Sequence, residues 1–258
     1  GYSPEAIEKP THDYQNFGID WVLRKLLVED LPGAGLFLDP GLGKTRMSLT
    51  ILDSLFQMQE ISRALIVAPL RPVYTVWPAE VKRWGFPQTY SILHQRIPGA
   101  FRDNCDIELV NFAGLAKLRT VKNRWDIIVI DESTFAKNWS THRCKNLREM
   151  IKTIPKRIIL TGTPAANSLA DLFAQIFILD NGQRLGLNVS RFRNQFMTRG
   201  GWQGKQWIFR PEREEDLLKS IQDVVLRMQA EDYLDMPELV INPIWCDMGT
   251  EQLRQYTR

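Results

Sequence analysis

The sequence predicts an α/β fold in which a parallel sheet is covered by helices on both faces. Two observations lead to this prediction. Short apolar runs alternate with amphipathic stretches over roughly residues 8–180, and several of the runs are apolar at successive positions. Strands and helices that alternate along a chain favour a parallel sheet, and strands without a polar face are expected where helices cover both sides.

The predicted elements follow in chain order. Six short apolar runs predict strands, at 35–39, 64–69, 90–94, 107–111, 126–132 and 157–163. Between them, apolar residues at helical spacing predict helices at 14–28, 44–58, 73–84, 143–153 and 169–179. These elements form the predicted core.

The alternation weakens after about residue 180. Residues 200–209 (GGWQGKQWIF) predict a small hairpin that turns near Gln203 and Gly204, and residues 212–226 predict a charged helix. An extended stretch with two prolines and the start of a last helix follow, at 236–245 and 249–258. We therefore divide the chain into a core lobe (1–180), a helical and hairpin insertion (181–242) and an exit segment (243–258).

Composition excludes several classes of protein. The chain has 258 residues, of which 44% are hydrophobic and 24% charged, as is ordinary for a globular protein. The net charge of +3 permits a nucleic-acid partner without requiring one. Cys105, Cys144 and Cys246 are too widely spaced for a disulfide framework or a zinc site, which favours a reducing, intracellular environment. No apolar run is long enough for a membrane span, so we expect no membrane partner.

The stretch LDPGLGKT, from Leu38 to Thr45, is the first candidate site. It lies between a predicted strand and a predicted helix, where backbone N–H groups and the positive end of the helix suit a phosphate chain. Lys44 would reach the β- and γ-phosphates, and the Thr45 hydroxyl would complete a Mg²⁺ shell. The expected nucleotide-binding residues of the loop are Gly41, Leu42, Gly43, Lys44, Thr45 and Arg46. The alternative is a glycine-rich turn with a surface lysine.

The predicted strand 126–132 ends in an acidic pair. Asp131 would hold Mg²⁺ and Glu132 would polarise the attacking water, which makes Glu132 and Lys44 the candidate catalytic residues. Acidic pairs at strand ends are common, but the glycine-rich loop upstream favours the catalytic interpretation.

A third candidate is the segment LTGTP. Thr161, Gly162 and Thr163 end a predicted strand, and the two threonine hydroxyls could sense the γ-phosphate through the acidic pair. The alternative is a turn before a helix capped by Asn167 or Ser168. One turn can serve both purposes.

The order LDPGLGKT, DEST, LTGTP resembles the first RecA-like lobe of superfamily 2 helicases, and specifically the Swi/Snf-like DNA translocases. The stretches 12–22, 64–84, 107–118, 133–150 and 234–256 are similar to other parts of that lobe, so the resemblance covers roughly residues 9–256. It implies an ATP- and Mg²⁺-dependent motor on duplex DNA in which Gln15 reads the adenine. It also implies non-specific contacts to the nucleic-acid backbone from Pro69, Leu70, Arg71, Asn111, Phe112, Lys137 and Asn138, each of which could instead be an ordinary loop residue.

Two departures from the family pattern concern the site. The family usually has a DEAH-like motif where this chain has DEST (131–134), so the contact that the histidine of that motif mediates is absent. The second departure is Leu38, which stands where the family commonly has Asp. No stretch after LTGTP resembles the arginine-bearing motif of the second lobe. We therefore expect one lobe of a two-lobe motor, which alone binds nucleotide weakly and hydrolyses it slowly or not at all.

Two other functions stay open. The chain could belong to another superfamily 2 motor, such as a restriction-type translocase or an RNA helicase, although LTGTP rather than SAT disfavours the DEAD-box branch. It could also be a non-catalytic nucleic-acid-binding module. Compact loops favour a bacterial or phage protein, and hence the cytoplasm over the nucleus. Of the tryptophans, we expect a core position for Trp21, Trp77, Trp84 and Trp125, and a place at the hairpin for Trp202 and Trp207.

Overall fold

The computed structural model describes residues 11–93, 105–118, 120–136, 138–162, 169–201 and 206–234. In these residues seven strands form one sheet in the order β3-β4-β2-β5-β6-β1-β9, and every neighbouring pair is parallel. The strands are β1 (Gly33–Leu38), β2 (Ala64–Ala68), β3 (Tyr90–Ile92), β4 (Ile107–Asn111), β5 (Ile127–Asp131), β6 (Lys156–Thr161) and β9 (Val225–Met228). The predicted parallel α/β sheet is therefore confirmed.

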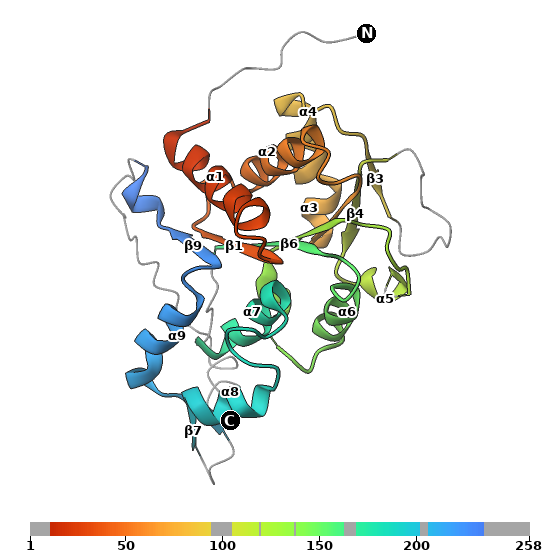
Figure 1. Cartoon of the computed structure of the whole chain (residues 1–258). Coiled ribbons are helices and arrows are strands. Elements are labelled where there is room, and N and C mark those ends of the chain that lie inside the picture. Colours follow the sequence, from red (N-terminus) through yellow and green to blue (C-terminus); the bar gives the residue numbers. More distant parts are fainter. Residues whose placement is uncertain are drawn as a thin grey trace, which may run out of the picture.

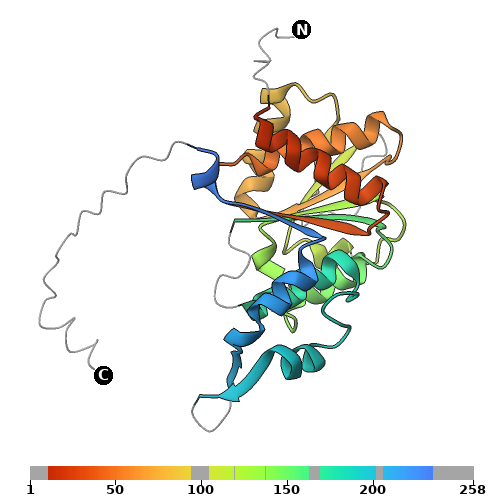
Figure 2. The ribbon, with the colours of Figure 1, turned by 60° about the vertical axis from the view of Figure 1, so that its left-hand side comes forward.

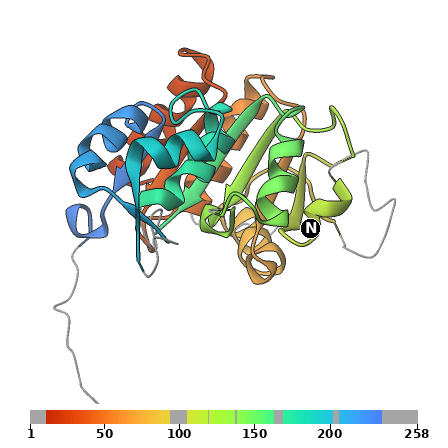
Figure 3. The ribbon, with the colours of Figure 1, turned by 90° about the horizontal axis from the view of Figure 1, so that it is seen from below.

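Helices cover both faces of this sheet, as Figures 1 and 2 show. One face carries α1 (Asp13–Leu27), α2 (Lys44–Gln57), α3 (Leu70–Tyr74) and α4 (Val76–Trp84). The other carries α5 (Leu115–Leu118), α6 (His142–Met150), α7 (Leu172–Asp180), α8 (Val189–Phe196) and α9 (Glu214–Ile221). Seen from that second side, α9, α7 and α6 lie next to one another across the sheet (Figure 3).

Successive apolar residues in the strands produce this three-layer arrangement. In β1, Leu36 and Leu38 pack into the core under α1 and α2, while Phe37 packs into the core on the opposite face. All six residues of β1 are buried. Because side chains alternate between the two faces of a strand, a strand that is apolar at every position requires cover on both sides.

The prediction for residues 212–226 is wrong at its C-terminal end. Helix α9 stops at Ile221, and Val225–Met228 forms β9, which pairs in parallel with β1. In β9, Met228 is buried, while Val225 and Leu226 are half-buried and pack against the cores on opposite faces of the sheet. Without β9, β1 would be an edge strand with unpaired backbone groups, which proteins generally avoid. The predicted boundary at residue 180 stays a prediction, but the chain beyond it contributes a strand to the main sheet.

Other boundaries differ less. The helix predicted at 73–84 is two helices, α3 and α4, that meet at Thr75. The hairpin is confirmed as β7 (Met197–Gly200) and β8 (Gln206–Phe209), an antiparallel pair. Its predicted turn, the extended stretch 236–245 and the helix at 249–258 lie outside the described residues. In the described part of the chain, no helix is long and apolar enough to cross a membrane.

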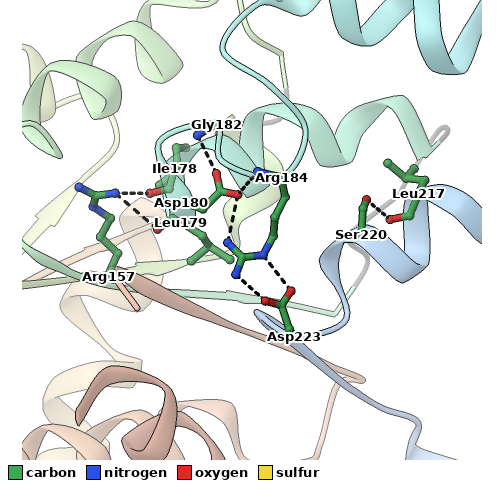
Figure 4. A network of polar contacts seen from close by, with 9 residues as sticks. All are labelled: Arg157, Ile178, Leu179, Asp180, Gly182, Arg184, Leu217, Ser220 and Asp223. Atoms are coloured by element: carbon green, nitrogen blue, oxygen red, sulfur yellow. Dashed lines mark hydrogen bonds and ion pairs between the residues drawn. The ribbon is translucent and has the colours of Figure 1, made fainter. Parts of the chain in front are cut away.

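A polar network fastens β9 and its preceding loop to the rest of the molecule (Figure 4). Arg184 donates to Asp223 through Nε at 2.8 Å and through its terminal nitrogen at 2.5 Å, and it also contacts Asp180 at 3.4 Å. Asp180 accepts from the backbone nitrogens of Gly182 and Arg184 at 2.7 and 2.9 Å. Nearby, the buried Arg157 donates to the carbonyl groups of Ile178 and Leu179. The end of α7 is thereby joined to the start of β9.

Candidate nucleotide site

The candidate residues gather at one edge of the sheet because its strands are parallel. The carboxyl ends of β1, β5 and β6 carry the glycine-rich loop, the acidic pair and Thr161. In the register of the sheet, Asp131 is opposite Leu160 and Thr161 is opposite Phe37. Three segments far apart in the sequence therefore meet at one place.

The glycine-rich loop joins β1 directly to α2. Leu38 is the last residue of β1 and is fully buried, so it belongs to the strand rather than to the loop. Gly41 and Gly43 have φ values of +92° and +80°, which favour glycine. Helix α2 starts at Lys44, so its first N–H groups and the positive end of its dipole face the loop. This geometry suits an anion.

The Lys44 ammonium lies inside the loop. Its Nζ donates to the carbonyl oxygens of Leu38 at 2.6 Å and Asp39 at 3.2 Å. Burial lowers the pKa of Lys44, while the charges of Glu132, Asp131 and Asp39 oppose that shift. The lysine is thus close to the acidic pair, as the prediction of one shared site requires.

Gln15 connects α1 to the loop. Its Nε2 donates to the Leu42 carbonyl at 3.1 Å, and its Oε1 accepts from the backbone nitrogen of His12 at 3.2 Å. A Cβ added to Gly43 would lie 2.4 Å from Gln15 Nε2, so only glycine permits this close approach. The glutamine is 4% exposed and is held at the loop by these contacts.

A cleft of about 950 Å³ opens beside the loop. The start of α1, the loop with the first turn of α2, and α4 form its walls, and Leu234 borders it. Its lining includes Gln15, Gly41, Gly43, Lys44, Thr45 and Arg46, which are six of the predicted nucleotide-binding residues. The side chain of Leu42, the seventh predicted residue, is fully buried in the core, and its backbone carbonyl accepts the hydrogen bond from Gln15.

The acidic pair is held by hydrogen bonds from neighbouring side chains. Trp77 donates from Nε1 to Asp131 at 3.1 Å. Burial raises the pKa of Asp131, and the Trp77 hydrogen bond opposes that shift. Glu132 has a φ of +56°, a left-handed conformation that is uncommon for a residue with a side chain. Such strain is often found at functional positions.

Hydroxyl groups surround the Glu132 carboxylate. Thr134 donates to its Oε1 at 2.6 Å, and Thr161 donates to the same oxygen at 3.3 Å. The buried Ser133 donates instead to Gln175 on α7, at 2.5 Å. A Cβ added to Gly162 would lie 3.2 Å from Pro40, so the end of β6 also approaches the loop. Thr163 lies outside the described residues.

The predicted nucleic-acid-binding residues follow the ends of neighbouring strands. Pro69, Leu70 and Arg71 follow β2, where Leu70 is 59% exposed and Arg71 is also exposed. Asn138 is exposed and accepts from the backbone nitrogen of Ser140 at 3.1 Å. Lys137 lies outside the described residues.

Two of these predictions need correction for their side chains. Phe112 is 4% exposed and packs in the core, so its ring offers no surface to a nucleic acid. Asn111 is 7% exposed, and its Oδ1 accepts from the backbone nitrogen of Gly114 at 2.9 Å, which stabilises the turn after β4. A residue that directly follows a strand can turn inward, and the sequence does not distinguish this from an outward position.

The sequence prediction also missed residues of the cleft. Trp84 was expected in the core, but it is half-buried and lines the cleft. Tyr14 lines it too, with its ring centroid 5.0 Å from that of Tyr233. Asp39 accepts a hydrogen bond from the backbone nitrogen of Ala230 at 3.0 Å. No sequence pattern indicated that residues 230–234 return to the loop.

Comparison with known proteins places this site in a family. Residues 14–258 match the profile of the SNF2-related domain. Putative protein p41 of Acyrthosiphon pisum secondary endosymbiont phage 1 is 28% identical over 245 residues, which cover 88% of this chain and 53% of p41. Nuclear protein STH1/NPS1 of Saccharomyces cerevisiae is 28% identical over 266 residues, which cover 95% of this chain and 19% of that protein.

Solved structures agree with the sequence comparison. The Sulfolobus solfataricus SWI2/SNF2 ATPase core in complex with dsDNA has a TM-score of 0.73 and 28% identity, over 99% of this chain and 53% of that one. The core domain without DNA has the same TM-score of 0.73, 27% identity and coverage of 99% and 51%. The chain therefore spans about half the length of these structures and of p41, and the likeness confirms the predicted RecA-like fold. The chain belongs to the SNF2-related domain family.

Proposed function

We propose that this chain is the ATP-binding first lobe of a Swi/Snf-like translocase that moves along double-stranded DNA. One observation carries the proposal: Lys44, the acidic pair and Thr161 meet at one sheet edge, and Thr161 reaches the Glu132 carboxylate at 3.3 Å. The dsDNA in the related Sulfolobus solfataricus structure supports duplex DNA as the track. Full hydrolysis would require a second RecA-like lobe.

The residues present fit a nucleotide triphosphate. The N–H groups of the loop and the first turn of α2 would bind phosphate oxygens, and Lys44 would exchange its two carbonyl partners for the β- and γ-phosphates. Because Gly43 has no Cβ, the Gln15 side chain can approach the loop closely. Gln15 would then face the adenine.

The residues also fit Mg²⁺. In the described part of the chain, no group of three or more His, Cys, Asp or Glu side chains could hold a metal ion by itself. Mg²⁺ does not need one, because it usually binds one or two carboxylates together with phosphates and water. Asp131 and the Thr45 hydroxyl would hold the ion, which neutralises phosphate charge when bound.

Glu132 is the group that would take a proton from the attacking water. Its carboxylate is oriented by the Thr134 and Thr161 hydroxyls at 2.6 and 3.3 Å. Thr161 is the last residue of β6, so a movement of the Glu132 carboxylate would also move the segment that follows this strand. The second lobe would supply arginine side chains for the transition state, which contribute ~10³–10⁵ in rate where they have been measured in other NTPases.

DNA would contact the loops at the same sheet edge. Leu70 and Arg71 are exposed at the start of α3, one strand away from the acidic pair in the sheet order. Such contacts to phosphates position a duplex without reading its sequence. The proposed place of action is inside the cell, in the cytoplasm of a bacterium or a phage-infected host, which the phage relative supports.

The proposal is tested in protein that carries this chain together with the second lobe. Lys44→Ala should abolish DNA-stimulated ATP hydrolysis, whereas Glu132→Gln should retain ATP binding and lose hydrolysis. Turnover at the wild-type rate in Lys44→Ala would refute the proposal. Weakened binding in Glu132→Gln would refute the role of that residue.

Two rival functions are separated by the choice of ligand. Stimulation of hydrolysis by duplex DNA, single-stranded DNA and RNA, measured side by side, distinguishes a duplex translocase from another superfamily 2 motor. Absence of ATP binding by calorimetry in the two-lobe protein would instead identify a non-catalytic binding module.

A further inference from the structure

The outer part of the cleft contains a stacked pair of side chains that phosphate binding does not require. The guanidinium carbon of Arg46 lies 3.8 Å from the ring centroid of Trp84, and both residues line the cleft. The guanidinium therefore lies over the face of the indole ring, in a cation–π contact. The pair joins the first turn of α2 to the end of α4.

The orientation of this pair is fixed by α4. The Trp84 indole donates from Nε1 to Glu80 at 2.6 Å, one helical turn earlier. Arg83 also lies over the Trp84 ring, with its guanidinium carbon 4.9 Å from the centroid. The indole is therefore held by its N–H group and forms a rigid backing for Arg46.

Arg46 lies between the two walls of the cleft. Its guanidinium is close enough to Glu80 on α4 for the two charges to attract each other. Gln15 lies on the same wall as Tyr14, and its carboxamide is held at the loop by the Leu42 carbonyl and the His12 backbone nitrogen. The space between these walls continues from the loop where Lys44 starts α2.

We propose that Arg46, backed by Trp84, is the platform on which the base of the bound nucleotide stacks. The inference rests on the proposed nucleotide site and adds the part of it that recognises a flat heteroaromatic ring. Guanidinium planes and aromatic rings are surfaces on which bases commonly stack. Arg46 contacts the base, and Trp84 is a positioning residue that holds the guanidinium in place.

A different role for Arg46 would be to bind a phosphate through its charge alone. Arg46 is two residues from Lys44, so sequence position does not separate the two roles. Stacking requires a planar group, whereas charge neutralisation requires only a cation. Lysine retains the charge without the plane, and this difference provides the test.

The experiment uses protein that carries this chain together with the second lobe, and measures its affinity for Mg·ATP and for inorganic tripolyphosphate by calorimetry. Arg46→Lys and Trp84→Ala should each weaken ATP binding about five- to a hundredfold, the range that loss of base stacking produces. Both should bind tripolyphosphate within about twofold of wild type, since the phosphate loop is intact. Trp84→Phe keeps a ring behind Arg46 and should recover most of the ATP affinity.

A matched control comes from the hairpin, where Arg199 lies 4.1 Å from the Trp207 ring centroid. Trp207→Ala removes a tryptophan from a similar pair outside the cleft and should leave both affinities unchanged. Circular dichroism verifies that each variant is folded.

The outcomes separate this inference from the proposed function. If Arg46→Lys binds ATP as wild type does, or if Trp84→Ala loses both ligands equally, the base platform is refuted. Lys44→Ala should lose both ligands. If instead it binds tripolyphosphate normally, the phosphate site itself is wrong.

Discussion

A carboxylate oxygen of Asp39 lies 3.0 Å from the backbone nitrogen of Ala230, although 191 positions separate the two residues. The backbone nitrogen of Asp39 in turn donates to the Met228 carbonyl at 3.2 Å. The first residue after β1 is therefore joined to the chain leaving β9. From there the Tyr233 ring packs against the Tyr14 ring in a tilted arrangement, with centroids 5.0 Å apart, and Leu234 borders the cleft.

We predict that Asp39→Ala loosens residues 230–234 from the cleft. The Ala230 N–H loses its acceptor, which lowers the free energy of unfolding by about 1–3 kcal/mol. Amide hydrogen exchange at Ala230 should become faster, measured by mass spectrometry beside urea unfolding. Asp39→Asn retains an acceptor oxygen and is the control. Unchanged exchange at Ala230 in Asp39→Ala would show that the contact does not hold this segment.

The Thr161 hydroxyl is predicted to matter for hydrolysis and not for binding. Thr161→Val keeps the shape but removes the group that donates to Glu132 at 3.3 Å. In the two-lobe protein, we expect ATP affinity within about twofold of wild type and a rate of hydrolysis reduced roughly tenfold or more, because general-base catalysis depends on the orientation of the base. Thr161→Ser retains the hydroxyl and should retain the rate. A rate equal to wild type in Thr161→Val would contradict the coupling role.

Gly43 is predicted to tolerate alanine less well than another glycine of similar backbone conformation. Gly43 and Gly186 have φ values of +80° and +87°, so both substitutions carry a backbone cost of about 1–2 kcal/mol. A Cβ at Gly186 meets nothing within 4 Å, whereas at Gly43 it lies 2.4 Å from Gln15 Nε2. Gly43→Ala should therefore also displace Gln15 and weaken ATP binding. Thermal unfolding and calorimetry measure the two effects, and equal ATP affinity in both variants would argue against the contact.

Local patterns in the sequence predicted most of the sheet and the phosphate loop. Each of these features depends on residues that are close in the chain, such as the apolar run that ends at Leu38 and the glycines that follow it. The carboxyl ends of parallel strands then bring Asp131 and Thr161 together without further information. The general position of the phosphate site therefore follows from the order of the motifs.

Features that depend on distant contacts could not be predicted in this way. The helix predicted at 212–226 includes residues that form the start of β9, and only pairing with β1 makes Val225–Met228 a strand. The helical spacing of Trp84 predicted a core position. Its place on the cleft wall depends on its contact with Arg46, which comes from another helix. Phe112 likewise points inward because it packs in the core on the face of the sheet that α5–α9 cover.

We predict that the Arg184–Asp223 ion pair makes the free energy of unfolding depend on pH under acidic conditions. The hydrogen bonds from Arg184 lower the pKa of Asp223 below its usual value. A carboxyl whose pKa is lower in the folded state stabilises that state above the pKa of the unfolded chain, about 3.9 for aspartate. The stabilisation is lost as pH falls through the folded-state pKa. Since the Asp223 side chain is 51% exposed, the expected contribution is below about 1 kcal/mol.

Urea unfolding between pH 7 and pH 3 checks this prediction. Asp223→Asn should lower the free energy of unfolding at pH 7, and its difference from wild type should shrink as the pH falls below about 4. Asp216→Asn is the matched control, because Asp216 forms an ion pair with Arg213 at 2.8 Å in which both side chains are about half exposed. This substitution should change the free energy of unfolding less. A difference for Asp223→Asn that stays constant over the whole range would mean that the charge of Asp223 does not hold β9 to the end of α7.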